Sequence, residues 1–173
     1  MRRGIGSKNK GRSFENKMAN LFTEWSKHKF KRVPMSGGWE KEVVSGDIFC
    51  VAEYEKSQDI RFPLSLELKC TEAWDFEHLF KGSDKNPIYT WWQQSTEDSK
   101  ISKKIPALIF TKNYQPDFIL LRLSILKKLN KLTKKTWEEF FYIHCFLGGE
   151  RVVVLLLSDF LGYINFSTLL QLT

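Results

Sequence analysis

The strongest constraint on the fold is the run at residues 64–70, Leu-Ser-Leu-Glu-Leu-Lys-Cys, in which apolar and polar residues alternate one by one. Side chains of a β-strand point alternately to its two faces, so the leucines share one face and Ser65, Glu67 and Lys69 share the other. The leucine face has to be covered by another layer of the protein. The run therefore predicts a sheet strand that holds Glu67 and Lys69 side by side.

A helix is predicted to precede this strand. Its signal is a set of apolar residues spaced three and four apart, namely Phe14, Met18, Leu21, Phe22 and Trp25. Ser13 is the expected N-cap, because its hydroxyl can accept a hydrogen bond from a free N–H of the first turn. Glu15 would then lie on that first turn.

The remaining elements are predicted from β-rich runs, turn residues and Pro87, which is suited to the first turn of a helix. Strands are expected at 43–51, 107–111, 118–123 and 151–157, helices at 87–103 and 124–131, and a long loop at 71–86. Residues 137–146 are too uniformly apolar for their periodicity to decide. Gly148 and Gly149 predict a turn or hairpin. This order of elements indicates an α/β fold.

Length and charge limit what the chain can be. At 173 residues it suits one domain, predicted at 13–173 after a basic flexible arm at 1–12. A net charge of +7 favours a polyanionic partner, either nucleic acid or a membrane surface. Basic residues crowd two regions, residues 2–12 and 127–135, although either cluster alone could be an ordinary solvated face.

Export and membrane insertion are not expected. The longest purely apolar run, residues 152–157, is far shorter than the roughly 20 residues of a membrane span. The three cysteines form no C-x-x-C pair, so they suggest neither a zinc site nor a disulfide framework. A reducing cytoplasm is the expected location.

Three residues have the chemistry for phosphodiester hydrolysis. Mg²⁺ prefers one or two carboxylates together with water and substrate oxygens, and Asp47 and Glu67 can supply that pair. If their strands are adjacent and antiparallel, Asp47 faces Glu67 across the ladder. Lys69 could then orient the attacking water or neutralise developing negative charge.

On its own, this spacing is a weak signal, because a short strand ending in Glu-x-Lys is common as a surface ion pair, but other segments accompany it in a distinctive order. They are Lys10-Gly11-Arg12-Ser13-Phe14-Glu15, Arg32-Val33-Pro34-Met35-Ser36-Gly37-Gly38, Gly46-Asp47-Ile48, Leu66-Glu67-Leu68-Lys69, Trp91-Trp92-Gln93-Gln94 and Ile105-Pro106-Ala107-Leu108-Ile109-Phe110. With them the chain resembles the PD-(D/E)-x-K nucleases, and among these the archaeal-type Holliday-junction resolvases and their phage relatives.

The resemblance implies a restriction-endonuclease-like mixed sheet flanked by helices. It runs from about Lys10 to Asn113, with the nuclease core predicted at about 13–113, and the remainder, about 114–173, would be a C-terminal α/β extension. One departure is that Gly46 stands where the family usually has a proline before the metal-binding aspartate.

The resemblance also implies roles for individual residues. Asp47 and Glu67 would bind Mg²⁺ or Mn²⁺, with the Leu68 carbonyl and Glu15 as further ligands, directly or through water. Lys69 would be the catalytic lysine. Ser36 would lie near the scissile phosphate and Gln94 would line the site, with Gln93 as the alternative. DNA contacts are expected from Arg2, Arg3, Lys8, Lys10, Arg12, Arg32 and Ser36.

The expected function is that of a structure-selective DNA endonuclease, a Holliday-junction resolvase that leaves 5′-phosphates. Symmetric cutting of a four-way junction would require a homodimer. The alternatives are a nuclease of the same fold acting on duplex or branched DNA in phage DNA processing or restriction, and a non-catalytic basic DNA-binding module.

Several aromatic residues and histidines have a structural and a functional interpretation. Trp91 and Trp92 are expected in the core rather than on a base-stacking surface. Trp74, Phe76 and Phe80 fall in the predicted loop and are expected at a partner surface or as a wedge against DNA. His28, His78 and His144 follow no metal-ligand spacing and are expected at the surface or in packing.

Overall fold

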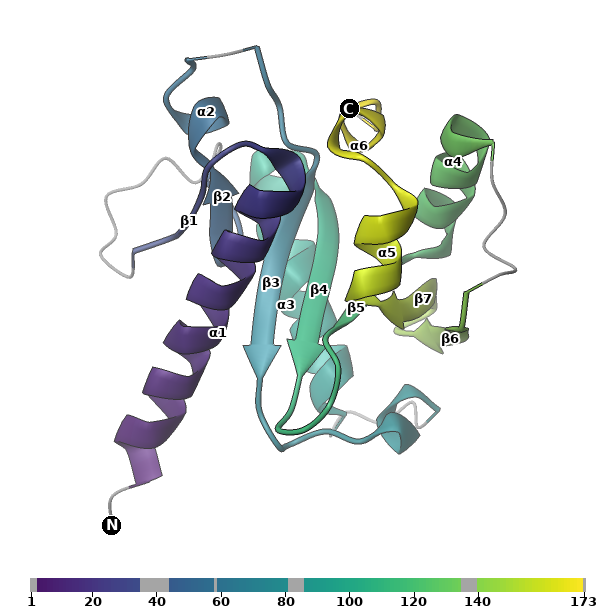
Figure 1. Cartoon of the computed structure of the whole chain (residues 1–173). Helices are drawn as coiled ribbons and strands as arrows, with labels where there is room; N and C mark the ends of the chain where they lie inside the picture. The colour runs from purple at the N-terminus through teal and green to yellow at the C-terminus, as the bar shows by residue number, and fades with distance from the viewer. Residues whose placement is uncertain (1–2, 35–43, 58, 81–85, 135–139, 173) are drawn as a thin grey trace.

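The computed structural model of the chain describes residues 3–34, 44–57, 59–80, 86–134 and 140–172. The elements follow one another along the chain as α1 (Arg3–Ser26), β1 (Phe30–Arg32), β2 (Ile48–Cys50), α2 (Val51–Tyr54), β3 (Leu64–Cys70), the 3-10 helix η1 (Phe76–Leu79), α3 (Pro87–Ser102), β4 (Ile105–Thr111), β5 (Phe118–Arg122), α4 (Leu123–Thr133), β6 (Tyr142–Leu147), β7 (Glu150–Leu156), α5 (Leu157–Tyr163) and α6 (Phe166–Leu170) (Figure 1).

Five strands form one mixed sheet in the order β3-β4-β5-β7-β6. Strands β3 and β4 are parallel and are joined by α3, whereas β5, β7 and β6 pair in antiparallel fashion. A second, two-stranded sheet pairs β1 with β2 beside the free edge of β3. The α/β mixed-sheet prediction is therefore confirmed, and the predicted extension contributes three strands to the same sheet as β3.

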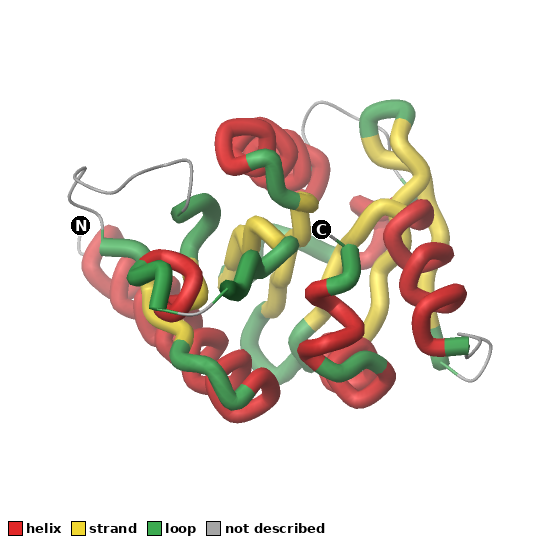
Figure 2. The backbone as a smooth tube through the Cα atoms, turned by 90° about the horizontal axis from the view of Figure 1, so that it is seen from above, coloured by secondary structure: helices red, strands yellow, loops and turns green. Residues whose placement is uncertain are grey.

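Helices cover both faces of the sheet, and Figure 2 shows α3 on the opposite side of the strands from α1 and α5. The leucines of β3 pack in a hydrophobic cluster with Phe22 of α1 and Phe160 of α5. The other cluster joins Trp92 of α3 to Leu108 of β4 and Val152 of β7. Glu67 and Lys69 therefore project from β3 towards the face that α3 covers.

Helix α1 begins at Arg3, ten residues earlier than predicted. Residues 3–12 are helical rather than irregular, and Ser13 lies inside the helix instead of capping it. The apolar periodicity starts only at Phe14, so the sequence pattern does not mark the first turns of the helix. The prediction of the helix start was therefore wrong.

Helix α3 agrees with its prediction. The side chain of Asn86 accepts hydrogen bonds from the N–H groups of Ile88 and Tyr89, and Pro87 occupies the first turn. The helix ends at Ser102 and is followed by the C-cap residue Lys103, whose φ of 54° is left-handed.

The strand predictions for β3, β4, β5 and β7 are confirmed within a residue or two, and Gly148 and Gly149 link β6 and β7 in a hairpin. The expected strand at 43–51 is much shorter, since β2 covers only Ile48–Cys50. Most of β6 lies in residues 137–146, the segment whose periodicity did not decide between helix and strand. None of the described helices is long and apolar enough to cross a membrane.

The loop predicted at 71–86 contains η1, and its aromatic residues differ in burial. Trp74 is fully buried against Phe110 and Phe118, so its predicted place at a partner surface is wrong. Phe80, by contrast, is 72% exposed. Trp92 lies in the core, as predicted.

Candidate active site

The centre of the candidate site is an ion pair on β3. The Lys69 Nζ lies 2.5 Å from Oε1 of Glu67, whose side chain is only 3% exposed. Oε1 is buried, and apart from this ion pair it has no partner among the described residues. The strand alternation predicted this pairing, and the cover provided by α3 explains why Glu67 is buried.

Helix α3 adds polar groups from the opposite layer. Lys69 Nζ donates a hydrogen bond to Oε1 of Gln94 over 3.3 Å. Gln93 points elsewhere, donating to the hydroxyl of Tyr89 over 2.8 Å. The structure therefore brings Gln94, rather than its neighbour, to the Glu67–Lys69 pair.

Asp98 also lies near this pair, and its negative charge helps to raise the pKa of Glu67. The sequence analysis did not select Asp98. The sequence could nevertheless have predicted its position, because residues four apart share one face of a helix and Asp98 follows Gln94 by four.

Asp47 reaches the site from the segment just before β2. Its N–H donates to the carbonyl of Leu66 over 2.7 Å, and its Oδ2 accepts from the N–H of Leu68 over 2.7 Å. These bonds attach Asp47 to the free edge of β3. The expected antiparallel ladder between Asp47 and Glu67 is wrong, because the contact is one isolated parallel bridge between Gly46 and Leu66.

The same edge presents the carbonyl of Leu68. Pro63 and Thr71 bond to β4 through their backbones, so the alternate residues of β3, Leu66 and Leu68, direct their peptide groups to the outer edge. The carbonyl of Leu68 thus lies on the edge to which Asp47 is attached.

Gly46 makes this close approach possible. Its φ is +80°, and a Cβ atom built on it would lie 2.3 Å from the carbonyl oxygen of Leu66. Proline cannot adopt this φ. The departure from the family's usual proline therefore comes with a different backbone path into Asp47.

Glu15 approaches from α1. Its Oε2 lies 3.3 Å from a guanidinium nitrogen of Arg32, and both side chains are 22% exposed. Its charge also contributes to raising the pKa of Asp47 and of Glu67. Glu15 is therefore beside the site, with Arg32 as its direct partner.

The carboxylates of Asp47 and Glu67 repel one another, and both are largely buried from solvent. Burial, followed by the negative charge of Glu67, raises the pKa of Asp47 to about 7, although the Leu68 N–H opposes the shift. Burial also raises the pKa of Glu67, and the Lys69 ammonium acts in the opposite direction. A cation placed between the two carboxylates would relieve both costs.

The donor set fits a hard divalent cation. Asp47 and Glu67 offer two carboxylates at one strand edge, which matches the preference of Mg²⁺ for few protein ligands and several oxygens from water or phosphate. No group of three His, Cys, Asp or Glu side chains with metal-binding geometry occurs within the described ranges.

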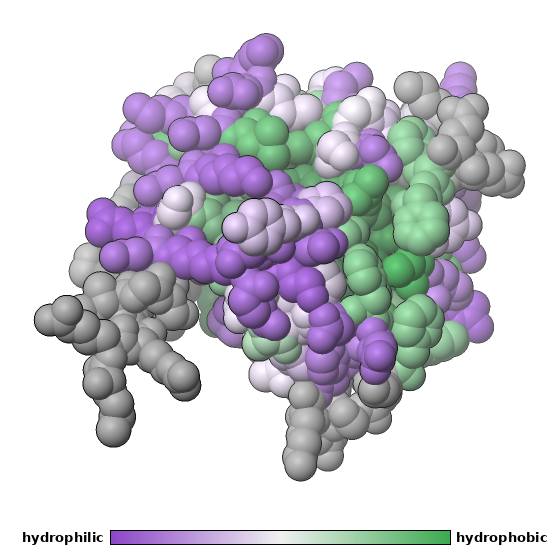
Figure 3. Space-filling view, turned by 60° about the horizontal axis from the view of Figure 1, so that its bottom comes forward, coloured by the Kyte–Doolittle hydropathy of each residue, from purple (hydrophilic) through white to green (hydrophobic). Residues whose placement is uncertain are grey.

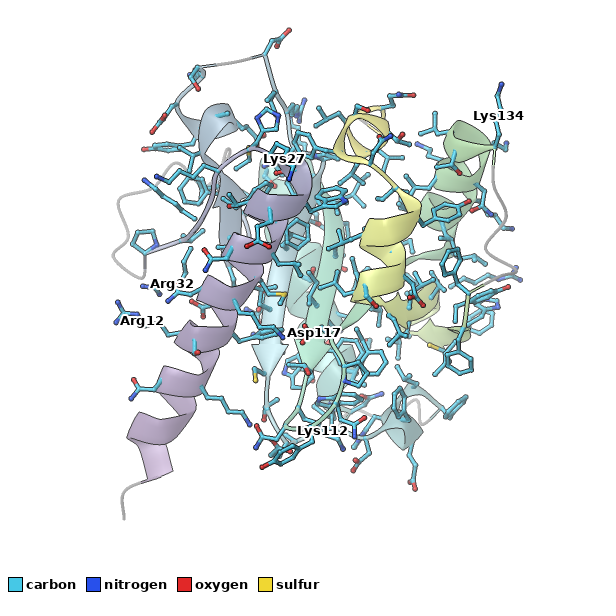
Figure 4. All side chains as sticks on the ribbon, viewed as in Figure 1. Arg12, Lys27, Arg32, Lys112, Asp117 and Lys134 are labelled. Carbon is cyan, nitrogen blue, oxygen red and sulfur yellow. The ribbon has the colours of Figure 1, made fainter. Side chains whose placement is uncertain are left out.

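Several predicted DNA-contacting residues lie on the α1 side of the molecule. Figure 4 labels Arg12 and Arg32 there, and Arg12 is exposed. Lys10 is engaged by Glu72, with 2.7 Å between Nζ and Oε1. Arg3 and Lys8 belong to α1, but their side chains, like Ser36 and Arg2, lie outside the described residues.

The three histidines occur in separate places. His28 packs against the ring of Phe166, His78 accepts a hydrogen bond from the Asp75 N–H in the cap of η1, and His144 is exposed on β6. None of them adjoins the Glu67–Lys69 pair in the contacts described above.

A family of known proteins matches this chain over most of its length. Residues 6–171 match the family described as "Phage putative PDDEXK endonuclease". Neither a curated protein nor a solved structure gives a significant match. The match spans nearly the whole chain, including α1, β3, α3 and the three strands beyond β4, and the protein therefore belongs to the phage PDDEXK endonuclease family.

Proposed function

We propose that this nuclease is a metal-dependent DNA endonuclease whose centre is built on Asp47, Glu67 and Lys69. The observation that carries the proposal is the meeting of these groups at one place: Asp47 is bonded to the Leu68 amide, and Lys69 contacts both Glu67 and Gln94. A purely structural ion pair would not need a second buried carboxylate attached to the same strand edge.

In this proposal Asp47, Glu67 and the Leu68 carbonyl hold Mg²⁺ or Mn²⁺, and Glu15 completes the shell directly or through water. When bound, the cation polarises the phosphate and lowers the pKa of a bound water. The chain's own residues then have separate tasks. Lys69 holds its ammonium beside the site to orient the attacking water and to balance charge on the phosphate oxygens.

Gln94 and Glu67 determine where the ammonium of Lys69 can lie. The amide oxygen of Gln94 accepts from Nζ, and the carboxylate of Glu67 attracts it from within the strand. Arg12, Arg32 and Ser36 are proposed to hold the DNA backbone near the scissile phosphate. Hydrolysis in this arrangement is proposed to leave a 5′-phosphate.

The finer substrate proposal is a four-way or otherwise branched DNA, cut by a homodimer that brings two centres to the junction. It rests on the resemblance to the Holliday-junction resolvases. The second candidate is cleavage of linear duplex by the same centre, in phage DNA processing or restriction.

The test compares a synthetic four-way junction with linear duplexes of the same arm sequences, with Mg²⁺, with Mn²⁺ and with EDTA. We expect cleavage that requires the cation and is lost in Asp47→Asn and Glu67→Gln. The matched control is Glu97→Gln, because Glu97 is an exposed acid on α3 that pairs only with Lys100 among the contacts described.

The outcomes separate the parts of the proposal. Undiminished cutting by Asp47→Asn would show that the centre is assigned wrongly. Equal cutting of junction and duplex would support the second candidate. A monomer in sedimentation at working concentrations would contradict paired cleavage.

A further inference from the structure

Strand β6 carries an exposed row of ring side chains far along the sheet from the candidate active site. Tyr142, His144 and Phe146 alternate with Ile143, Cys145 and Leu147 and so share one face of the strand. Phe146 is 59% exposed and Tyr142 is 41% exposed. The rings of His144 and Phe146 have centroids 5.9 Å apart.

Exposed rings on an edge strand keep apolar surface in contact with water, and the described residues leave much of the Tyr142 and Phe146 side chains uncovered. Figure 3 shows hydrophobic side chains gathering on the side of the molecule that carries β6 and β7, whereas hydrophilic side chains cover the side of α1. This exposed row is separate from the two hydrophobic clusters that hold the sheet between its helices.

Positive charge adjoins these rings. Arg151, opposite Phe146 in the β6–β7 ladder, holds its guanidinium carbon 5.5 Å from the Phe146 ring centroid. Arg151 and Lys127 of α4 line the same surface hollow. Lys127 therefore continues the surface from β7 onto the helix.

Further lysines extend this charge along α4. Lys127, Lys131 and Lys134 follow one another at helical spacings, and Lys128 lies beside them. All four are exposed, and no carboxylate among the described residues pairs with them or with Arg151. Figure 4 labels Lys134 at the end of α4, on the other side of the molecule from Arg12 and Arg32.

The nearby Arg122, unlike Arg151 and Lys127, is paired with a carboxylate. Its guanidinium forms two 3.0 Å hydrogen bonds with Glu150 and lies over the Trp92 ring, so its charge is already balanced. Arg151 and Lys127 line the same hollow without such a partner. The surface therefore offers uncompensated positive charge beside exposed rings.

We infer that Tyr142, His144 and Phe146, together with Arg151 and the α4 lysines, form a second DNA-binding surface that takes single-stranded DNA. Unpaired bases present faces that stack on aromatic side chains, and the phosphates of the same strand are attracted to the lysines. A duplex hides its base faces and could use only the charges. The surface goes beyond the proposed cleavage and does not depend on it.

Charge argues against a second copy of the chain as the occupant. In a two-fold contact each copy presents the same patch, so Lys127 and Arg151 would face like charges across the rings. Repulsion of this kind disfavours association unless acidic groups intervene. In single-stranded DNA, by contrast, the bases can stack on the rings and the phosphates can pair with the positive charges.

The test measures binding of a fluorescent oligo-dT of about 20 nucleotides, long enough for a site of this kind, to the full chain in EDTA. We expect Phe146→Ala combined with Tyr142→Ala to weaken binding by about 10-fold or more. Phe146→Trp should retain binding because it preserves a stacking ring. Binding to a duplex of equal length should change by less than about 2-fold, since its base faces stay paired.

The matched aromatic control is Tyr114→Ala, because Tyr114 is fully exposed in the turn between β4 and β5 and should leave oligo-dT binding unchanged. Lys127→Ala and Lys131→Ala should each lower the salt dependence of binding, with a slope change of about 0.7 per lost phosphate contact. Lys27→Ala, at the end of α1, is the corresponding control. These lysine variants also test the surface if a β6 variant fails to fold.

The inference is overturned if the ring variants bind oligo-dT as tightly as the wild type. It is also overturned if the wild type forms dimers that Phe146→Ala abolishes, since the rings would then be covered by a second copy. Because EDTA prevents metal-dependent cutting, loss of binding in the ring variants supports the surface even if the nuclease assays of the proposed function fail.

Discussion

The carboxylate of Asp47 accepts a 2.7 Å hydrogen bond from the backbone N–H of Leu68, which attaches it to the strand that carries Glu67 and Lys69. Backbone atoms of β3 therefore hold Asp47 in place, and no side chain is needed to orient it. The cost is that two carboxylates share a poorly hydrated site, and this cost leads to the first prediction.

The raised pKa of Asp47 should make the stability of the protein depend on pH. Its pKa is about 7 in the folded protein against 3.8 as the ordinary value, so the folded state retains a proton that the unfolded state has released. The free energy of unfolding of the metal-free protein should therefore fall as the pH rises from about 4 to about 7, by roughly 1–4 kcal/mol. Urea unfolding in EDTA at several pH values measures this.

Asp47→Asn should flatten that dependence, because an amide does not ionise but its oxygen can still accept from the Leu68 N–H. Asp59→Asn is the control, since Asp59 is exposed. Mg²⁺ should raise the stability of the wild type at about pH 8 by preferential binding to the folded state. If Mg²⁺ stabilised Asp47→Asn equally, Asp47 would not be a ligand.

Glu67 and Lys69 should be energetically coupled. Lys69→Met removes the cation beside a buried carboxylate and should destabilise the metal-free protein by about 1–3 kcal/mol at neutral pH. Glu67→Gln together with Lys69→Met should recover most of this loss, because no charge is then left unpaired. A double-mutant cycle by urea unfolding measures the coupling, and strictly additive effects would contradict it.

Gly46→Ala should both unfold and inactivate the protein. The new methyl group would meet the Leu66 carbonyl at 2.3 Å in a left-handed backbone conformation, so the segment would have to leave the edge of β3. We expect a loss of about 3 kcal/mol or more, measured by thermal unfolding. Gly162→Ala is the control because nothing lies within 4 Å of its Cβ position. Equal effects of the two changes would exclude a special role for Gly46.

A second buried ion pair should matter for stability alone. Lys104 Nζ lies 2.7 Å from Oε2 of Glu53, and the two side chains are 4% and 10% exposed. Lys104→Met leaves the carboxylate of Glu53 without this cation and should cost about 3 kcal/mol. Cleavage per folded molecule should stay unchanged, which a cutting assay normalised to the folded fraction would show. Lys100→Met, in an exposed pair, should have little effect.

The predictability of the site differs between its residues. Glu67 and Lys69 followed from strand alternation, which is a local property. Asp47 did not, because it reaches β3 through one bridge made by Gly46, and no periodicity marks such a contact. The resemblance to known nucleases indicated Asp47, but it gave no reason for Gly46.

The errors in the fold have a similar origin. Trp74 lies in a loop as predicted, yet it is buried because Phe110 and Phe118, distant in sequence, supply its surroundings. The early start of α1 was missed because residues 3–13 show no apolar periodicity. Helix α3, in contrast, was predictable from Asn86 and Pro87 because a cap is encoded within a few residues.

The continuous sheet has a consequence for shortened forms of the chain. Strand β5 hydrogen-bonds directly to β4, and the side chain of Trp92 on the helix of Gln94 donates a 3.2 Å hydrogen bond to Glu150 of β7. Removal of the residues beyond 113 would therefore leave β4 without its neighbour β5 and Trp92 without its hydrogen-bond partner Glu150. The strands beyond residue 113 therefore help to stabilise the helix that carries Gln94.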